Sequence, residues 1–295
     1  MMSPFELIDL SMTSSRAKRA VTIFSRIKPR FSVRLYLRRE QIIFIKGHEE
    51  EWGYVWRTNQ SPTRRLLYFI SAPSKNPRAD CLKWYEMIKE ILGCNVNDMC
   101  VPSPDKPLTD WLRSHQSSIE KITMISGEKE DVKYFFKTMN VFGKIDLAMS
   151  RSENDFRLEF PEGLNHLELF NTEFVTYKQL LRLKARNIVF THSILTDQEI
   201  NGFLKSWMSM ESHLDLECFE MTFHDEEALR EIMDLPNQMI ADSNLMEKMR
   251  RIFIIYTMTT GFNIKRCDGK VATVCLGRFL FTTAVLFNSS LIGTD

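Results

Sequence analysis

Cysteine and histidine are the residues best suited to nucleophilic or metal chemistry, and this sequence carries six of each. A cysteine nucleophile needs a histidine close in space, and a zinc site usually needs ligand pairs a few residues apart. The cysteines stand at positions 81, 94, 100, 218, 267 and 275, and the histidines at 48, 115, 166, 192, 213 and 224. This scatter predicts no metal site and no disulfide framework, and it indicates a reducing, cytoplasmic or nuclear location.

Two histidines, His166 and His192, lie beside expected strands. Either becomes a candidate base if the fold brings a carboxylate or a nucleophile near it. The sequence contains no glycine-rich phosphate loop, no HExxH zinc pair and no GxSxG elbow. We therefore expect a protein that is not an enzyme and binds no cofactor. A hydrolase with a Cys/His pair assembled in space is a lesser alternative.

The composition is that of a globular protein, with 44% hydrophobic and 26% charged residues among 295. A formal net charge of +1 argues against a nucleic-acid or membrane partner for the chain as a whole. A basic run lies between Asp9 and Glu40, but the acidic residues 49–51 follow it closely. The longest uncharged run, 279–294, is shorter than a membrane helix requires. We expect neither nucleic acid nor a membrane as a partner.

The start of the chain predicts helices and then strands. Residues 4–27 show apolar residues at helical spacing, with Pro4 suited to a first helical position, and a serine-rich stretch divides them into two helices. From Phe31 onward apolar and polar residues alternate, which predicts an antiparallel meander. Residues 79–92 form an expected amphipathic helix that ends at Gly93. The stretch 100–107, with three prolines, is expected to be a loop.

The middle of the chain repeats with a period of about 21 to 26 residues. Expected strands centre at 122–124, 145–147, 167–169, 188–190 and 214–216, with helices at 131–139, 177–183 and 197–208 and a further strand within 148–161. The last two helices each begin with a capping box, formed by Thr176 with Gln179 and by Thr196 with Glu199. Such βα units predict a parallel sheet with helices on one side.

A helix over 226–233 and a second β section follow the repeat, with expected strands at 252–256, 262–266, 271–276 and 279–287. Asp268 and Gly269 predict a two-residue type I′ turn, in which both central residues have positive φ. The predicted fold class is therefore α/β: a short α-helical segment, then an irregular leucine-rich-like βα-repeat domain with flanking β-hairpins. Repeats of this kind offer a continuous surface for binding macromolecules.

Three stretches resemble the F-box proteins of the expanded nematode families. The run from Met2 to Val21 resembles the second and third helices of an F-box. Residues 164–223, which include Leu195-Thr-Asp-Gln-Glu-Ile-Asn-Gly-Phe-Leu-Lys-Ser-Trp207, are similar to the type 2 F-box-associated domain, and 261–273 to the closing hairpin of those proteins. The resemblance implies a partial F-box at 1–30 and an F-box-associated substrate-binding region at 31–295, with its type 2 core at about 160–225.

The resemblance implies the substrate-recognition subunit of a Skp–cullin–F-box ubiquitin ligase, which binds a protein target for ubiquitylation. Its implied partners are a Skp-type adaptor, a cullin and a protein substrate. The implied adaptor-binding residues are Pro4, Leu7, Ile8 and Leu10, which match apolar positions of the F-box motif. A complete F-box begins with a further helix, so we expect adaptor binding to be weak or lost if the amino terminus is truncated. The alternative is a stand-alone βα-repeat interaction module without ligase recruitment.

Overall fold

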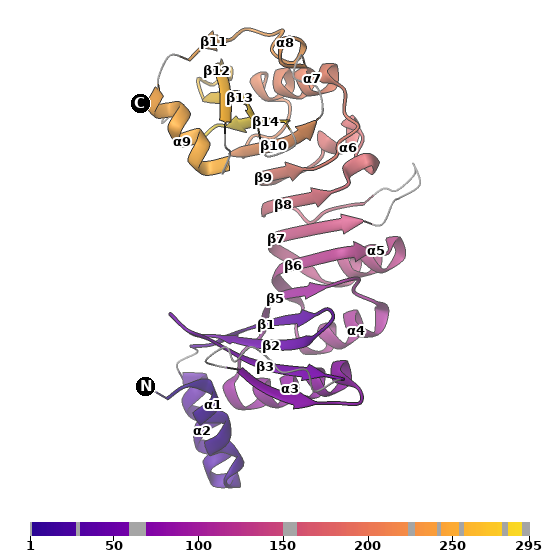
Figure 1. Cartoon of the computed structure of the whole chain (residues 1–295), viewed down its shortest axis with the longest axis vertical. Coiled ribbons are helices and arrows are strands. Elements are labelled where there is room, and N and C mark those ends of the chain that lie inside the picture. The colour runs from indigo at the N-terminus through magenta and orange to yellow at the C-terminus, as the bar shows by residue number, and fades with distance from the viewer. Residues whose placement is uncertain are drawn as a thin grey trace. The chain divides into compact units, whose positions relative to one another are not determined.

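The computed structural model describes residues 2–27, 30–58, 69–149, 158–223, 228–240, 243–253, 257–278 and 283–290. The chain divides into two compact units, Met1–Ile125 and Ser126–Asp295. Both units combine helices with β-strands, as Figure 1 shows, which confirms the predicted α/β class.

The first unit begins with a helical hairpin. α1 (Pro4–Met12) and α2 (Ser15–Ile27) are separate helices, as predicted. A capping box starts α1: the Glu6 amide donates to the Ser3 hydroxyl at 3.2 Å, and the Ser3 amide donates to the Glu6 carboxylate at 2.7 Å. The other elements of this unit are β1 (Ser32–Leu37), β2 (Gln41–Lys46), β3 (Glu51–Arg57), β4 (Phe69–Pro73), α3 (Pro77–Leu92), β5 (Val96–Val101), α4 (Lys106–His115) and β6 (Ser118–Gly127).

The strands of the first unit lie in the order β6-β5-β1-β2-β3-β4. β1, β2 and β3 pair antiparallel, which confirms the predicted meander, whereas β5 pairs parallel with both β1 and β6. The loop predicted at 100–107 is wrong at both ends. Cys100 and Val101 extend β5, and Pro107 lies in the first turn of α4, where the missing amide hydrogen costs nothing.

The second unit is built around the parallel strands β7 (Asn140–Met149), β8 (Leu164–Phe170), β9 (Ala185–Phe190) and β10 (Cys218–Phe223). The antiparallel strands β14 (Thr283–Asn288), β13 (Val271–Arg278), β12 (Thr257–Lys265) and β11 (Gln238–Met239) continue the sheet beyond β10. The helical elements are α5 (Lys129–Thr138), the 3₁₀ turn η1 (Thr172–Phe174), α6 (Tyr177–Leu180), α7 (Asp197–Met208), α8 (Ala228–Ile232) and α9 (Ser243–Phe253).

Helix α7 covers one face of this sheet and has the predicted bounds. Its Thr196–Glu199 capping box is present, as is the Thr176–Gln179 box of the shorter α6. The fully buried ring of Trp207 meets Phe287 of β14 edge-on at 5.1 Å, and Phe203 lies 4.8 Å from Phe219 of β10. The apolar side of α7 therefore forms a core with Phe219 of β10 and Phe287 of β14.

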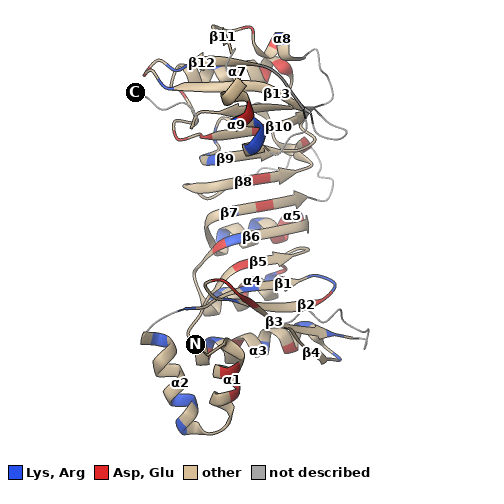
Figure 2. Ribbon diagram, turned by 60° about the vertical axis from the view of Figure 1, so that its left-hand side comes forward, with Lys and Arg blue, Asp and Glu red and all other residues tan. Residues whose placement is uncertain are grey.

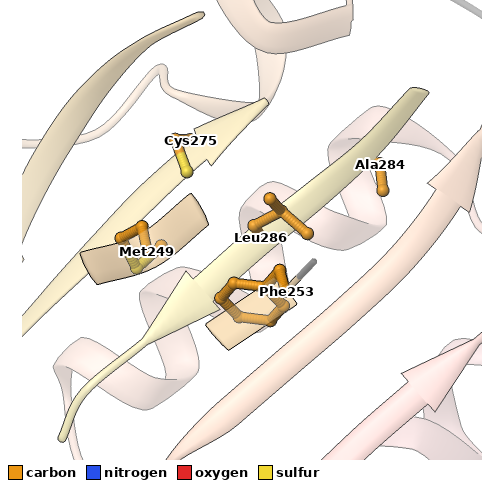
Figure 3. Packing of buried hydrophobic residues seen from close by; sticks show 5 residues of the cluster. All are labelled: Met249, Phe253, Cys275, Ala284 and Leu286. Carbon is orange, nitrogen blue, oxygen red and sulfur yellow. The ribbon is translucent and has the colours of Figure 1, made fainter. Parts of the chain in front are cut away.

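The opposite face of the sheet is covered by α9 over β13 and β14. Figure 3 shows Met249 and Phe253 of α9 packed against Cys275, Ala284 and Leu286. This helix replaces a predicted strand: Ile252 and Phe253 belong to α9 because Met249 and Phe253, four residues apart, share its buried face. Residues 254–256 of that prediction lie outside the described residues.

Two further predictions in this unit are wrong. Residues 214–216 form no strand, since Leu214 is 48% exposed and only Leu216 is buried; β10 begins at Cys218. The turn after β12 has three residues, 267–269, of which Gly269 alone has a positive φ, at 96°. The Arg266 guanidinium holds the Asp268 carboxylate at 2.9 and 2.6 Å, and Gly269 then forms the bulge typical of three-residue hairpin loops.

The strand predicted within 148–161 falls mainly on 150–157, outside the described residues, as do 226–227 of the predicted helix and 279–282 of the predicted last strand.

Candidate protein-interaction surfaces

The first candidate surface is the exposed side of the α1–α2 hairpin. Of the four residues implied to bind an adaptor, Pro4, Leu7 and Ile8 are buried within the unit, and Leu10 is 41% exposed. Phe5 of α1 packs edge-on against Tyr54 of β3 at 4.8 Å. The buried residues therefore hold the hairpin in place, and Leu10 alone of the four is presented to a partner in this conformation.

Other large apolar side chains of the hairpin are exposed as well. They are Met2, Met12, Ile23, Phe24 and Ile27, with exposed fractions between 43% and 79%. α2 also carries Arg16, Lys18, Arg19 and Arg26 and no acidic residue, as its blue segments in Figure 2 show. Exposed apolar residues rimmed by charge are typical of protein-interaction sites. This surface suits a partner with an apolar, acidic face.

The second candidate surface is the face of β7–β10 opposite α7. Strand alternation and register place two rows of side chains directly opposite one another across the four strands. One row is Lys144, His166, Asn187 and Cys218; the other is Asp146, Glu168, Val189 and Glu220. We call this surface the open face. Figure 2 shows its acidic segments on β7 and β8.

Ion pairs order the β7 and β8 part of the open face. The Lys144 ammonium lies 3.0 Å from an Asp146 carboxylate oxygen and 3.2 Å from one of Glu168, and His166 Nε2 lies 3.5 Å from the same Glu168 oxygen. Hydrogen bonding by His166, followed by the bond and charge of Lys144, lowers the pKa of Glu168 to about 2. Although burial acts against it, the pKa of Lys144 is raised by Asp146 and Glu168.

Glu220 lies in a different environment on the same face. It is directly opposite Leu286 of β14, at the margin of the area that α9 covers. Within the described residues it has no basic side chain as a partner. Burial, and next the negative charge of Glu168, raise the pKa of Glu220 to about 7. Near neutral pH this carboxyl group is therefore only partly ionised.

Glu220→Gln is expected to stabilise the fold at pH 8 by about 1–2 kcal/mol. A carboxyl whose pKa is raised on folding keeps its proton in the native state, so wild-type stability falls as the pH rises from 4.5 to about 7. The gain of the variant should vanish below pH 4.5, where wild-type Glu220 is protonated in both states. Urea unfolding at pH 4, 6 and 8 measures it, and a pH-independent difference would contradict the assigned cause.

The three groups Asp146, His166 and Glu168 bring ligand atoms within 4.8 Å of one another, close enough to hold a metal ion. The ammonium of Lys144, however, contacts both carboxylates and occupies the place that a cation needs. The arrangement is thus an ion-pair network. The network places His166 beside a carboxylate, which is the arrangement that a candidate base requires. His192 lies just after β9, and its backbone amide donates to the Thr222 hydroxyl at 3.1 Å.

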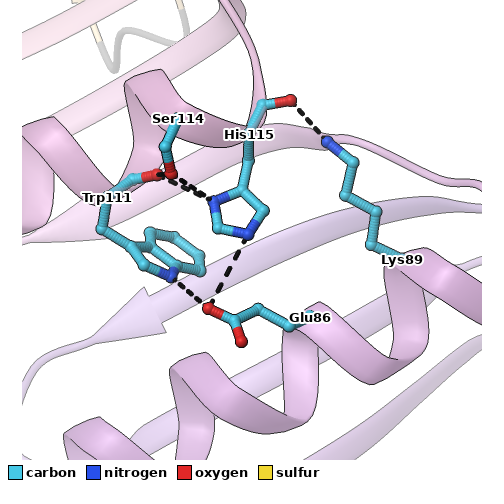
Figure 4. Close-up of polar contacts among 5 residues, drawn as sticks. All are labelled: Glu86, Lys89, Trp111, Ser114 and His115. Atoms are coloured by element: carbon cyan, nitrogen blue, oxygen red, sulfur yellow. Dashed lines mark hydrogen bonds and ion pairs between the residues drawn. The ribbon is translucent and has the colours of Figure 1, made fainter.

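A serine, a histidine and a carboxylate also meet between α3 and α4 (Figure 4). The carbonyl of Trp111 lies 2.6 Å from Ser114 Oγ and 2.8 Å from His115 Nδ1. Because a carbonyl only accepts, Nδ1 carries the proton and is unable to take one from Ser114. Glu86 accepts from Trp111 Nε1 at 2.9 Å, and Lys89 donates to the His115 carbonyl at 2.6 Å. These contacts join α4 to α3 and form no nucleophile–base pair.

Four of the six cysteines, Cys81, Cys94, Cys218 and Cys275, give the hydrolase alternative no support. The thiol of Cys218 accepts a hydrogen bond from the Asn288 amide at 2.9 Å, and burial raises its pKa to about 11. Burial raises the pKa of Cys81, Cys94 and Cys275 to about 12. Thiols of this kind carry little thiolate at neutral pH and are poor nucleophiles.

A cavity of about 870 Å³ lies at the amino-terminal ends of β8 and β9. Lys184 and Glu162 form an ion pair of 2.6 Å at its rim. The other charged residues that line it are two basic and two acidic ones: Arg182, Arg186, Glu211 and Asp215. His213 lines it, and burial lowers the pKa of this histidine to about 4. The balanced charges give the cavity no preference for an anion or a cation.

Comparison with known proteins bears on the open face. A family model described as F-box associated matches residues 155–221, which include β8, β9 and most of β10. This match supports an F-box-associated domain in this part of the chain, a domain of protein-interaction type. No curated protein and no solved structure matches the chain. In the part of the chain that the structure describes, no helix is long and apolar enough to span a membrane.

The sequence named the hairpin residues and missed the open face. Its charged residues are spread over β7, β8 and β10, so no single local motif joins them. A signal was nonetheless present: Lys144 and Asp146 alternate with buried Ile145 and Leu147, as expected of strands with one polar face.

Proposed function

We propose that this chain is the substrate-recognition subunit of a Skp–cullin–F-box ubiquitin ligase. In this proposal the exposed side of the α1–α2 hairpin binds a Skp-type adaptor, and the open face binds a protein substrate in the cytoplasm or nucleus. The subunit contributes proximity, since it raises the local concentration of substrate at the ligase. The observation that carries the proposal is the F-box-associated match over residues 155–221, which include three of the four strands of the open face: β8, β9 and most of β10.

The hairpin supports the adaptor-binding part of the proposal. Its buried residues fix α1 against the first unit, while Leu10, Ile23 and Phe24 are 41%, 59% and 51% exposed. The Lys18–Glu90 ion pair of 2.7 Å joins α2 to α3 and leaves the apolar side of α2 open. A preformed apolar surface loses little conformational entropy on binding, which favours affinity.

Single substitutions Leu10→Asp and Ile23→Asp are expected to weaken adaptor binding by about 30-fold or more, the effect of losing an apolar anchor worth ~2 kcal/mol. Isothermal titration of the purified full chain with a Skp-type adaptor measures this. Ile194→Asp is the matched control, because Ile194 is 57% exposed in the second unit and should leave affinity unchanged. Wild-type affinity in both hairpin variants would contradict the assigned surface. No adaptor binding by the wild-type chain would favour the stand-alone interaction module.

A further inference from the structure

The acidic groups of the open face outnumber its basic groups. It carries three carboxyl groups, Asp146, Glu168 and Glu220, and one ammonium group, that of Lys144. Lys144 contacts the first two at 3.0 and 3.2 Å. Within the described chain, Glu220 pairs with no basic side chain, although its carboxyl group is largely buried. A half-buried carboxylate without a counter-charge is costly, so the face lacks a cation at this position.

Val189 leaves room for that cation. It lies directly between Glu168 and Glu220 on the middle strand, and it is the one apolar member of its row. With neighbouring strands about 4.8 Å apart, the two acids stand roughly 10 Å apart at their backbones. Val189 is partly exposed and its side chain is shorter than those of the two acids, so a guanidinium or ammonium group from another molecule can approach the carboxylates over it.

Exposed aromatic rings flank the charged rows on the same face. Phe142 precedes Lys144 by two residues on β7, and Phe170 follows Glu168 by two on β8; they are 51% and 36% exposed. Residues two apart on a strand share a face. Aromatic rings attract cations over their faces, and arginine stacks on them better than lysine because its guanidinium is planar. Phe170, two residues from Glu168, is the ring nearest the acids and favours arginine there, whereas Phe142 lies four residues before the acidic row and can contact only a neighbouring part of a bound segment.

The first unit contains the same combination within its own sheet. Arg34 of β1 lies over the ring of Phe44 of β2 at 4.3 Å, and it also contacts the Glu51 carboxylate of β3 at 3.2 Å. An arginine thus satisfies an acid and an aromatic ring on a sheet surface of this chain. On the open face the acid and the rings are present, and the arginine is not among the described residues.

We propose that the open face binds an extended, arginine-bearing segment of the substrate protein, with the guanidinium seated above Val189 between Glu168 and Glu220. This inference rests on the proposed function, because it names the chemistry of the substrate at the surface assigned there. Phe142 and Phe170 contact neighbouring side chains of the same segment. Arginine is the fitting residue because it stays charged and donates two parallel hydrogen bonds to a carboxylate.

Selection from a random peptide library displayed on phage tests the proposal with the full-length chain. Peptides retained by the wild type should be enriched in arginine at one position, and synthetic copies should bind the Glu220→Gln variant about tenfold or more weakly. Val189→Arg supplies a guanidinium at the same place from within the chain and should abolish binding. Glu162→Gln is the matched control, since Glu162 is an exposed acid away from the open face and should leave affinity unchanged.

Each other outcome is informative. If the selected peptides fail to bind the Val189→Arg variant but show no preference for arginine, the inference is overturned. The assignment of substrate binding to the open face then still stands. Arginine peptides that bind Glu220→Gln as well as wild type would also overturn it. If every selected peptide still binds the Val189→Arg variant, both the inference and the assignment of substrate binding to the open face are wrong. Thermal unfolding of each variant confirms that the fold is retained.

Discussion

Replacing Trp207 with alanine is expected to lower the free energy of unfolding of the second unit by about 3–5 kcal/mol, the usual cost of removing a large buried aromatic side chain. Trp207 is fully buried at the end of α7. Its ring meets Phe287 of β14 at 5.1 Å, and the Arg266 guanidinium lies over it at 5.3 Å. The substitution therefore opens a cavity where α7, the end of β12 and β14 meet.

Urea unfolding followed by near-ultraviolet circular dichroism measures the loss at Trp207. Met210→Ala is a suitable control, because Met210 follows the same helix, is 39% exposed and should change stability by less than about 0.5 kcal/mol. A loss of under about 1 kcal/mol at Trp207 would show that the ring does not anchor α7 to the sheet. Substrate peptides should also bind the variant more weakly, since α7 supports the strands that present the open face.

Replacing Lys144 with methionine is expected to cost about 2 kcal/mol at pH 7. Removing one partner of a buried pair costs more, but a third of the Lys144 side chain is exposed and water screens the rest in part. The variant leaves Asp146 and Glu168 facing each other without their shared cation. Because Asp146 is only 9% exposed, its charge has little access to water.

The cost of Lys144→Met should depend on pH. In the wild type the pKa of Glu168 is held at about 2, against 4.5 in the unfolded chain, so the stability from its contacts is complete above 4.5 and is lost as the pH falls to about 2. The variant loses the share of this stability that the contact between Lys144 and Glu168 provides. The free energies of unfolding of the variant and the wild type should therefore converge toward pH 2. Lys133→Met is the control: its 3.4 Å pair with Glu130 is exposed and should contribute under about 0.5 kcal/mol. A pH-independent difference would contradict the ion-pair explanation.

Two of the three carboxyl groups of the open face, those of Glu168 and Glu220, have opposite effects on stability. His166 and Lys144 lower the pKa of Glu168, which therefore stabilises the fold, whereas burial and the charge of Glu168 raise the pKa of Glu220, which costs stability as the pH rises from 4.5 to about 7. A residue that costs stability and lies at the margin of a proposed binding surface fits a role in binding. The Glu220→Gln variant separates the two roles, since it should be more stable than the wild type and yet bind arginine-bearing peptides less well.

The sequence predicted the elements whose causes are local. The bounds of α7 follow from the Thr196–Glu199 box, and α3 ends at Gly93, whose φ of 69° suits glycine. Where the signal was only a run of apolar residues, prediction failed. Residues 252–256 are apolar and two leucines flank Asp215 in 214–216, but Leu214 is exposed, and 252–256 begin inside α9. Such runs do not distinguish a strand from a loop or a helix end.

The sequence by itself thus determined the α/β class, the capped helices and the apolar character of the hairpin, because capping and side-chain periodicity act between residues a few positions apart. Only the tertiary structure decided which hairpin residues are buried and which acids meet. Strand register places Glu168, Val189 and Glu220 in one row although long connections separate them in the chain. Lys144 contacts Asp146 two residues along its own strand and Glu168 diagonally across on β8, whereas Glu220 lies two strands further on, beyond its reach.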